Sequence, residues 1–425
     1  MQQVLMKGKL IFYLMLFLCF PGFSQENYHE KLWKIDSVVI KKNWRTRDKI
    51  IMRELQFEPG ETIDKTCIEN SINQIWNIGN FAFVDYTLDS ISPESYLMNI
   101  QAKDAFTLLP NLSFSGTRND YNLGVGIEDN NFLGRNITLN LNGNIGTYGK
   151  NYNIGVDIPR QLLYKNMTLS FQALNGTGNN FRYSGDEQIS AVAYHKKQFS
   201  GSIGNPWHTD YHYTFSPNFS WNLFQHKTDT SLIDTDVPFV EDYEVNYLAL
   251  GFNESIGMIN RKRHQKDGYS VSVGYGVGIG LDKNSPFYHS VGLSAVYYKL
   301  LNPVVELSAQ FSTGYTSSTL PSLITYLGPG NVKGLMTGKE SGQGYYSGKI
   351  EAGFTYFNRD WFALEQTIYT NIGEANDRYF NIYKTVPRIS FGTGFRIWTP
   401  MIPWLGASIH FVWLKGSENW FYLDI

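Results

Sequence analysis

Beyond about residue 105 the chain alternates between apolar and polar residues. In the segment 269–281 every odd position is apolar or aromatic, and every even position is serine or glycine. The same alternation runs through 167–173, 305–311 and 389–397, and clusters of asparagine, glycine and aspartate separate the alternating stretches. Successive side chains of a β-strand point to opposite faces of a sheet. The pattern therefore predicts a series of strands, each with one apolar and one polar face.

Strands of this kind suit a membrane barrel, with the apolar face toward lipid and the polar face toward a lumen. Only a closed barrel lets strands cross lipid with every backbone group paired. Residues 105–425, at roughly 20 residues per strand and connection, leave room for about 16 strands, an even number as is usual for such barrels. The predicted fold class is a transmembrane antiparallel β-barrel. A large soluble β-sandwich or propeller is the alternative.

Residues 32–104 show a different order of patterns, β-α-α-β-β, which predicts a small α+β domain before the barrel. Thr46 is a candidate N-cap for the first helix. Asp64 is the candidate for the second, in which isoleucines recur at helical spacing until Gly79 ends the helix. The predicted strands are 33–40, 81–88 and 96–102, the predicted first helix is 47–55, and a turn at 58–61 follows it.

The composition agrees with a membrane barrel. Charged residues make up 17% of the chain and aromatic residues 16%, whereas soluble proteins carry about 25% charged residues. The 28 tyrosines and 10 tryptophans suit aromatic girdles at two membrane interfaces. A formal net charge of −2 is too close to neutral for a nucleic-acid surface, so nucleic acid is not an expected partner.

Residues 1–24 are predicted to be a secretory signal peptide. Two lysines precede a short apolar stretch, and Gly22 and Ser24 fit positions −3 and −1 of a cleavage site. A lipoprotein signal ending at Cys19 is the alternative, and the bulky leucine before that cysteine argues against it. No later apolar run approaches the ~18 residues of a membrane helix. Cys67 is then the only cysteine of the mature chain, so we expect no internal disulfide and a core position for it.

Three candidate chemical sites are weaker than their structural alternatives. Glycines at 274, 276, 278 and 280 lie inside a strand, whereas a dinucleotide fingerprint requires a strand–turn–helix. His208, Asp210 and His212 would share one strand face and could hold a metal ion, but a polar cluster is the simpler interpretation. No serine stands out beside a positioned histidine. We therefore expect no catalytic residue, no metal site and no cofactor, and do not expect an enzyme.

The N-terminal domain resembles a POTRA domain. That family typically runs from a helix ending in Arg-Glu-Leu, through a glycine turn, to a Gly-x-Phe start of the next strand. The matching residues here are Arg53-Glu54-Leu55, Gly60 and Gly79-Asn80-Phe81. Some other small α+β domain is the alternative. A POTRA domain offers a sheet edge to which an extended polypeptide can add as a strand.

Two stretches of the barrel resemble the BamA/TamA family of outer-membrane assembly and translocation barrels. The first, 124–141, is similar to the family's early hairpin, and the matching residues are Asp129, Asn131, Phe132, Leu133 and Gly134. The second, 326–354, is similar to the sixth extracellular loop, which in the family folds back into the lumen and carries Val-Arg-Gly and an aromatic residue. This chain has Val332, Lys333, Gly334 and Leu335 there. The chain length puts this loop between strands eleven and twelve of about 16, as in the family.

The sequence departs from the family at the loop. In the family the loop arginine pairs with an aspartate inside the lumen, and Lys333 and Asn371 occupy those positions here, so a weaker hydrogen bond would replace a forked ion pair. Glu351 and Tyr369 are further candidate lumen partners, Glu351 because its charge could pair with Lys333. The chain ends in Leu-Asp-Ile instead of an aromatic residue. The resemblance thus implies a docked but loosened loop, and favours a specialised paralogue.

The resemblance implies a protein in the outer membrane of a Gram-negative-type bacterium that assembles or translocates other proteins, with its POTRA domain in the periplasm. The implied partners are outer-membrane lipids, unfolded β-barrel or secreted clients, and periplasmic or lipoprotein accessory subunits. A seam between the first strand, near 108–116, and the last, near 404–414 or beyond, would be weakly paired and would offer an edge to a client. A passive or two-partner-secretion-like pore, and a decayed structural or lipid-interacting paralogue, are the alternatives.

Overall fold

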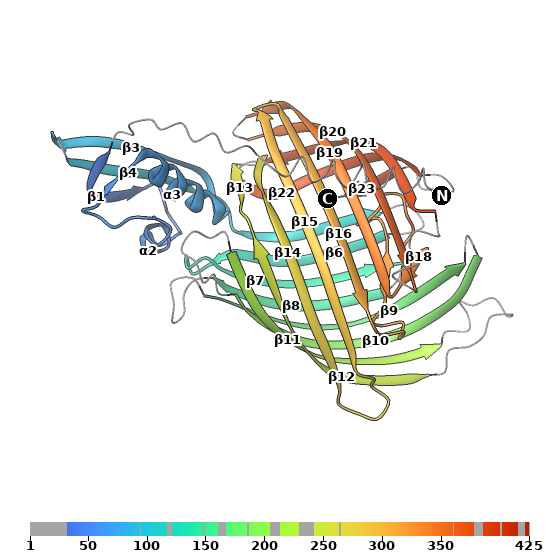
Figure 1. Cartoon of the computed structure of the whole chain (residues 1–425). Coiled ribbons are helices and arrows are strands. Elements are labelled where there is room, and N and C mark those ends of the chain that lie inside the picture. The colour runs from blue at the N-terminus through green and yellow to red at the C-terminus, as the bar shows by residue number, and fades with distance from the viewer. Residues whose placement is uncertain are drawn as a thin grey trace, which may run out of the picture.

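The computed structural model describes residues 32–93, 95–116, 121–147, 149–159, 167–184, 187–204, 213–228, 242–262, 265–359, 361–377, 386–399, 402–414 and 421–424. A small α+β domain at the N-terminus lies against one end of a large β-barrel (Figure 1). The predicted signal peptide and the candidate metal cluster of His208, Asp210 and His212 lie outside the described residues.

The N-terminal domain is a four-stranded sheet with two helices. Its strands are β1 (Trp33–Lys41), β2 (Thr62–Ile63), β3 (Phe81–Ser92) and β4 (Ser95–Asp104), and its helices are α2 (Asp48–Met52) and α3 (Lys65–Asn77). The sheet order is β2-β1-β4-β3, in which β1 and β4 run parallel and the other neighbours run antiparallel. The predicted order of elements is confirmed, and β2 is an additional short strand.

Isoleucines of α3 form the core between this helix and the sheet. Ile68 and Ile75, spaced for one helical face, are both fully buried. Asp64 caps the helix, because its carboxylate accepts a hydrogen bond from the Cys67 amide at 2.7 Å. Gly79 follows the helix with a φ of +79°, which favours glycine. Cys67 packs at the edge of this core, and burial raises the pKa of its thiol.

The predicted capping role of Thr46 is wrong. Arg47 holds the N-cap position of α2 without a side-chain hydrogen bond, and the helix runs only from Asp48 to Met52. The Thr46 hydroxyl instead donates to the carboxylate of Asp104 at the end of β4, and Thr46 is 3% exposed. The Thr46 side chain makes this tertiary contact and therefore does not cap the helix.

The strands from β5 onward form a closed barrel with antiparallel neighbours. Its strands are β5 (Leu108–Gly116), β6 (Tyr121–Phe132), β7 (Ile137–Gly146), β8 (Gly149–Pro159), β9 (Thr168–Ser184), β10 (Glu187–Gly204), β11 (Tyr213–Thr228), β12 (Tyr243–Ile256), β13 (Ile259–Lys262), β14 (Gln265–Gly280), β15 (Tyr288–Asn302), β16 (Val305–Thr316), β19 (Gly344–Asn358), β20 (Ala363–Asn376), β21 (Arg388–Thr399), β22 (Ile402–Leu414) and β23 (Phe421–Asp424). Between β16 and β19, β17 (Thr325–Leu327) and β18 (Glu340–Gly342) form a separate two-stranded sheet.

The barrel has sixteen strands in the described part of the chain, which confirms the predicted number of about 16. Both β12 and β13 pair with β14, one after the other along the same edge, so they are two parts of one strand. The break between them lies at Gly257, whose φ of +108° is a left-handed conformation that favours glycine. With β12 and β13 counted together, the loop 317–343 lies between strands eleven and twelve, as predicted.

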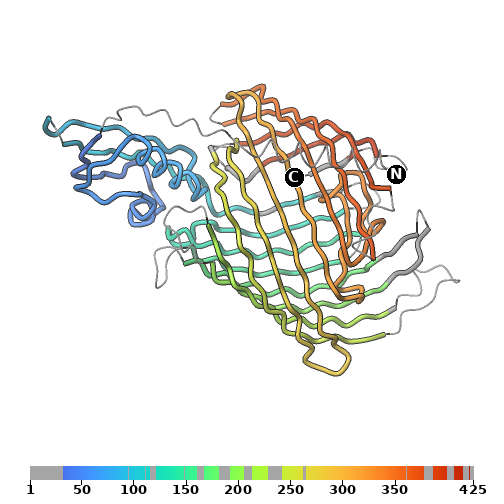
Figure 2. The backbone as a smooth tube through the Cα atoms, viewed as in Figure 1, coloured from blue at the N-terminus to red at the C-terminus, as the bar shows by residue number. Residues whose placement is uncertain are grey.

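The outer surface of the barrel is apolar, as the alternation predicts. On β14, Tyr269, Val273, Tyr275 and Ile279 are 39–49% exposed, while the serines and glycines between them face the lumen. The backbone trace shows the strands running at a tilt around the barrel (Figure 2). This exposed apolar band is the surface that a bilayer would cover. None of the helices in the described residues is both long and apolar enough to span a bilayer.

Candidate functional site

The loop 317–343 folds into the barrel lumen and is held there by an apolar contact. Val332 and Leu335 are buried, and they cluster with Leu327 of β17 and Ala375 on the lumen side of β20. Gly334, between them, has a φ of +86°, which reverses the chain at the tip. A Cβ on Gly373 would lie 2.6 Å from Val332, so the loop approaches the barrel wall closely.

Lys333 reaches the wall at two aromatic rings. Its Nζ lies 2.8 Å from Nε2 of His410 on β22 and 5.1 Å from the ring centre of Tyr369 on β20. The short Nζ–Nε2 distance is that of a hydrogen bond from the ammonium to an imidazole nitrogen. Of the candidate lumen partners, Tyr369 is therefore in contact with Lys333.

The other two candidate partners bind elsewhere among the described residues. The Asn371 amide, 2% exposed, donates to Ser390 Oγ at 3.1 Å. Glu351 pairs with Arg396 at 2.6 Å and Lys349 at 2.7 Å, not with Lys333 as the charge argument suggested. Glu351 pairs with Lys349 and Arg396 because these two residues lie on the barrel wall beside it, on β19 and β21.

His410 was not among the site residues predicted from the sequence, although the sequence contains a signal for it. On β22, Ile409, Phe411 and Trp413 are exposed to the outside, while His410 and Val412 are buried on the lumen side. Alternation alone therefore puts His410 on the lumen face. It could not identify His410 as the contact of a loop residue 77 positions away in sequence.

The loop also contacts the opposite wall. Leu320 and Leu323 pack against an aromatic cluster formed by Phe224, Tyr247 and Tyr288 on β11, β12 and β15. The Asn180 amide of β9 donates to the Pro321 carbonyl at 3.1 Å. The loop thus crosses the lumen from β20–β22 to β9–β15.

The early hairpin motif lies at the junction between the two domains. Asp129 pairs with Arg45 of the β1–α2 connection at 2.6 Å, and the Asn131 amide donates to Thr46 Oγ1 at 2.7 Å. Asn131 is fully buried, and its carbonyl oxygen accepts a hydrogen bond from the Asn136 amide at 2.8 Å. A network of polar side chains therefore joins the β6–β7 turn to the N-terminal domain.

The backbone of the same turn is bound as well. The carbonyl of Gly134 accepts a hydrogen bond from the Arg47 amide at 3.1 Å, and that of Leu133 accepts one from Arg47 Nε at 3.2 Å. Gly134 has a φ of +70°, and a Cβ there would lie 2.1 Å from the carbonyl oxygen of Arg45. The side chains of Phe132 and Leu133 are exposed, so Leu133 contributes its carbonyl alone to this contact.

A second contact joins the domain to a distant part of the barrel rim. Asn77 at the end of α3 hydrogen bonds to Asn260 at 3.2 Å and accepts from the Arg261 amide at 3.1 Å, both on β13. Gln74 donates to Met258 Sδ at 3.2 Å. We call the rim with these two contacts the near rim, and the rim from which the loop 317–343 emerges the far rim. The domain spans part of the near rim (Figure 1).

The barrel closes at a short seam between β5 and β23. Within the described ranges, which leave out residues 117–120 and 425, two pairs join these strands, Leu423 with Gly116 and Asp424 with Ser115. In contrast, nine residue pairs join β5 to β6, and nine join β6 to β7. The last strand is β23, beyond the 404–414 segment that the sequence suggested first.

Comparisons with known proteins agree with this architecture. No family model matches the chain. A curated Treponema pallidum (strain Nichols) protein with the provisional name outer membrane protein assembly factor is 21% identical over 147 residues. These residues are 32% of this chain and only 17% of that protein.

Three solved structures share the fold over 92% of this chain. BamA from Haemophilus ducreyi lacking POTRA domains 1–3 has a TM-score of 0.56 and 14% identity, with 84% of its chain covered. CdiB from Escherichia coli has a TM-score of 0.64 and 10% identity, with 76% covered. CdiB from Acinetobacter baumannii has a TM-score of 0.56 and 14% identity, with 73% covered.

The chain is therefore a transmembrane barrel preceded by a small α+β domain, with the fold of BamA and CdiB. The resemblance to outer-membrane barrels of the BamA/TamA family, inferred from sequence motifs, is confirmed in the fold.

Proposed function

We propose that this protein assembles or translocates client proteins at the outer membrane. Its near rim would face the periplasm, where the N-terminal domain, as a POTRA domain, receives an unfolded client and passes it to the seam. The observation that carries the proposal is the seam itself, which is two residue pairs wide in the described part of the chain, beside strands joined by nine pairs. No chemical step is required.

The edge of β5 is the surface that a client strand would use. Over residues 108–114 this strand pairs with β6, and among the described residues it has no strand partner on its other side. Unpaired backbone N–H and C=O groups in a row are a template for another strand. The twelve-residue edge strand β3 of the N-terminal domain offers a second such row close to the barrel.

A disulfide across the seam tests the proposal. Ser115→Cys with Asp424→Cys joins two residues that are partners in the β5–β23 register. We expect oxidation of this variant to stop the insertion of a urea-denatured outer-membrane barrel protein into liposomes that contain the full chain. Reduction should restore insertion.

The matched control locks a well-paired junction. Ser312 and Ser347 are register partners on β16 and β19 with their hydroxyl oxygens 2.8 Å apart, so Ser312→Cys with Ser347→Cys closes a disulfide without touching the seam. Unimpaired insertion with the seam locked would overturn the proposal, and so would equal loss in both variants.

A second candidate function is a secretion pore of the two-partner type. It is favoured by the TM-score of 0.64 with CdiB, a two-partner secretion transporter. The loop across the lumen argues against a permanently open channel. A large, steady conductance of the purified protein in a planar bilayer would favour the pore, and brief or absent conductance favours the assembly function.

A further inference from the structure

The lumen has two chemically different halves. The lumen face of β19–β21 carries charged side chains among its polar ones, and Glu351, Glu365 and Arg396 form ion pairs there. On the strands next to the seam the central lumen-facing side chains are uncharged and dominated by asparagine. These are Ser113 on β5, Asn140, Asn142 and Asn144 on β7, and Asn151 and Asn153 on β8.

A glycine lies directly opposite several of these asparagines on the neighbouring strand. Asn144 is the register partner of Gly124, and Asn142 of Gly126. A Cβ on Gly124 would lie 2.4 Å from the Asn144 amide oxygen, and one on Gly126 would lie 2.1 Å from that of Asn142. The amides therefore lie across the glycines, flat against the wall. We call this surface the asparagine wall.

The same pairing recurs across the lumen at β11–β14. Asn218 is paired with Gly251, and Asn253 with Gly274, whose Cβ would lie 2.5 Å from the Asn253 amide oxygen. The arrangement is thus a repeated feature of the lumen and not one local contact.

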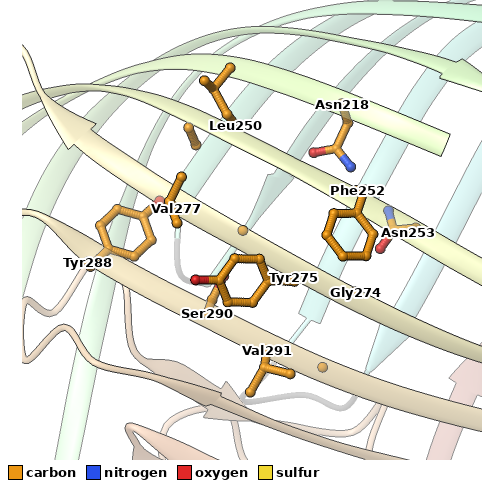
Figure 3. A pocket seen from close by; sticks show the side chains of 13 residues that line it. Asn218, Leu250, Phe252, Asn253, Gly274, Tyr275, Val277, Tyr288, Ser290 and Val291 are labelled. Carbon is orange, nitrogen blue, oxygen red and sulfur yellow. The ribbon is translucent and has the colours of Figure 1, made fainter.

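Two hollows lie over these glycine and asparagine positions. One, of about 360 Å³, is lined by Asn218, Asn253, Gly274 and Ser290 and also by apolar side chains, among them Leu250, Tyr275 and Val291 of the outer face (Figure 3). The other, of about 260 Å³, is lined by Ser113, Gly124 and four asparagines of β7 and β8. The second hollow lies on β5 to β9, beside the seam.

The polar groups of the second hollow are incompletely used by the protein. Asn144 donates to Asn151 at 3.1 Å, but the buried amide oxygen of Asn153 has no hydrogen-bond partner within the described part of the chain. A buried acceptor without a partner is costly, so a ligand donor at this position would be favoured. Charged side chains adjoin the wall on two sides. Toward the near rim these are Asp157 and Glu128, the register partner of Asn140, and across β9 it is Lys196, which is paired with Gly176 and lies over the Phe224 ring.

We propose that the asparagine wall binds an extended, uncharged polypeptide segment of the client before this segment reaches β5. This inference rests on the proposed function and adds a binding surface to it. Along β7, Asn140, Asn142 and Asn144 repeat every second residue, about 6.8 Å apart. An extended polypeptide has the same two-residue repeat, so every second peptide group meets one of the amides, which both donate and accept.

A polypeptide fits this wall better than an ion or a glycan. Uncharged amides provide no counter-charge for an ion. The aromatic side chains of these strands, among them Tyr121 and Tyr152, are exposed on the outside, so the wall has no ring on which a sugar would stack. Because the wall carries no charge, it would accept segments of varied sequence and disfavour charged ones.

Photocrosslinking with the full chain in liposomes tests the inference. A photoreactive residue at Asn142 or Asn153 faces the lumen, while one at Leu141 or Ile154, which are 56% and 58% exposed, faces lipid from the neighbouring position. With the urea-denatured barrel protein as probe, we expect crosslinks from 142 and 153 and none from 141 and 154. Lipopolysaccharide in the same liposomes tests whether the asparagine wall binds a glycan instead.

Substitution supplies a second measurement. Asn142→Leu with Asn153→Leu removes two amides, so we expect the concentration of probe that gives half-maximal insertion to rise about tenfold. Asn284→Leu, an exposed residue at the far rim, makes the same chemical change off the wall and should have no effect.

The outcomes separate the two proposals. If the probe inserts but crosslinks arise only from Leu112 on the β5 edge, the assembly function stands and the asparagine wall is wrong. If positions 142 and 153 crosslink to lipopolysaccharide alone, the wall binds a glycan and not a polypeptide, and the inference is wrong. If the probe neither inserts nor crosslinks, both proposals fail.

Discussion

At the residue scale, Lys333 distinguishes this chain from the sequence pattern of the BamA/TamA family that it resembles. A lysine presents its charge as a point and cannot form the forked pair of an arginine, and here it meets a histidine nitrogen and a tyrosine ring instead of a carboxylate. The apolar contacts of Val332 and Leu335 provide the other part of the docking. The loop is therefore held by packing, by the Lys333–His410 hydrogen bond, and by an ion pair at 2.7 Å between Glu340 of β18 and Arg388 of β21.

Removal of this hydrogen bond should loosen the loop without unfolding the barrel. A hydrogen bond to a charged group contributes about 1.5–3 kcal/mol, so His410→Ala should raise the undocked population roughly 10–100-fold. Protease nicking of the loop 317–343 in liposomes measures this population. Lys283→Ala, in another far-rim loop, removes an exposed lysine and serves as control. Equal nicking in both variants would contradict the docking role of His410.

At the element scale, the β6–β7 turn acts as a contact between domains. Gly134→Ala is expected to displace the turn, because the new Cβ would meet the Arg45 carbonyl oxygen at 2.1 Å. Gly60→Ala has a comparable positive φ of +101° and no atom within 4 Å, so it isolates backbone strain from the clash. Hydrogen exchange of the Arg47 amide, bonded to the Gly134 carbonyl, should speed up in the first variant only. Slow exchange in Gly134→Ala would show that the turn is not tied to the domain.

The whole molecule has its N-terminal domain tied to the near rim by two groups of hydrogen bonds. One group involves the β6–β7 turn and the end of β8, where Arg53 donates to the Pro159 carbonyl at 3.3 Å, and the other involves β13, several strands further around the barrel. Spin labels at Ser90 of β3 and Val304 of the β15–β16 turn should therefore report one narrow distance. The first group loses its side-chain bonds in a variant with Arg45, Arg47, Arg53 and Asn131 changed to alanine, and the second in a variant with Gln74 and Asn77 changed to alanine. Both sets of changes together should broaden the distribution, while either set alone should keep it narrow. A broad distribution in the unsubstituted chain would contradict the two-contact arrangement.

The sequence predicted the repeating features of the molecule and missed the contacts between distant segments. Alternation identified the strands of the barrel, and Asp64 and Gly79 marked the two ends of α3, because such signals are local. Thr46 was assigned to a local cap because its partner, Asp104, is 58 residues away. The role of Asn131 was equally hidden, since its side chain contacts a residue 85 positions earlier. The first contact depends on the tertiary fold of the N-terminal domain and the second on how the two domains meet, and no periodicity encodes either.

The glycines under the asparagine wall have a consequence for the width of the passage. Each one allows a planar amide to lie where a methyl group would otherwise push it inward, as at Gly124 and Gly126. The inner width of the barrel thus depends on the absence of side chains at these glycines. Substitution of these water-facing glycines by alanine, ordinarily a mild change on a strand, would swing the amides into the lumen and narrow it. In a survey of all single substitutions, these positions should be as intolerant as a packed core.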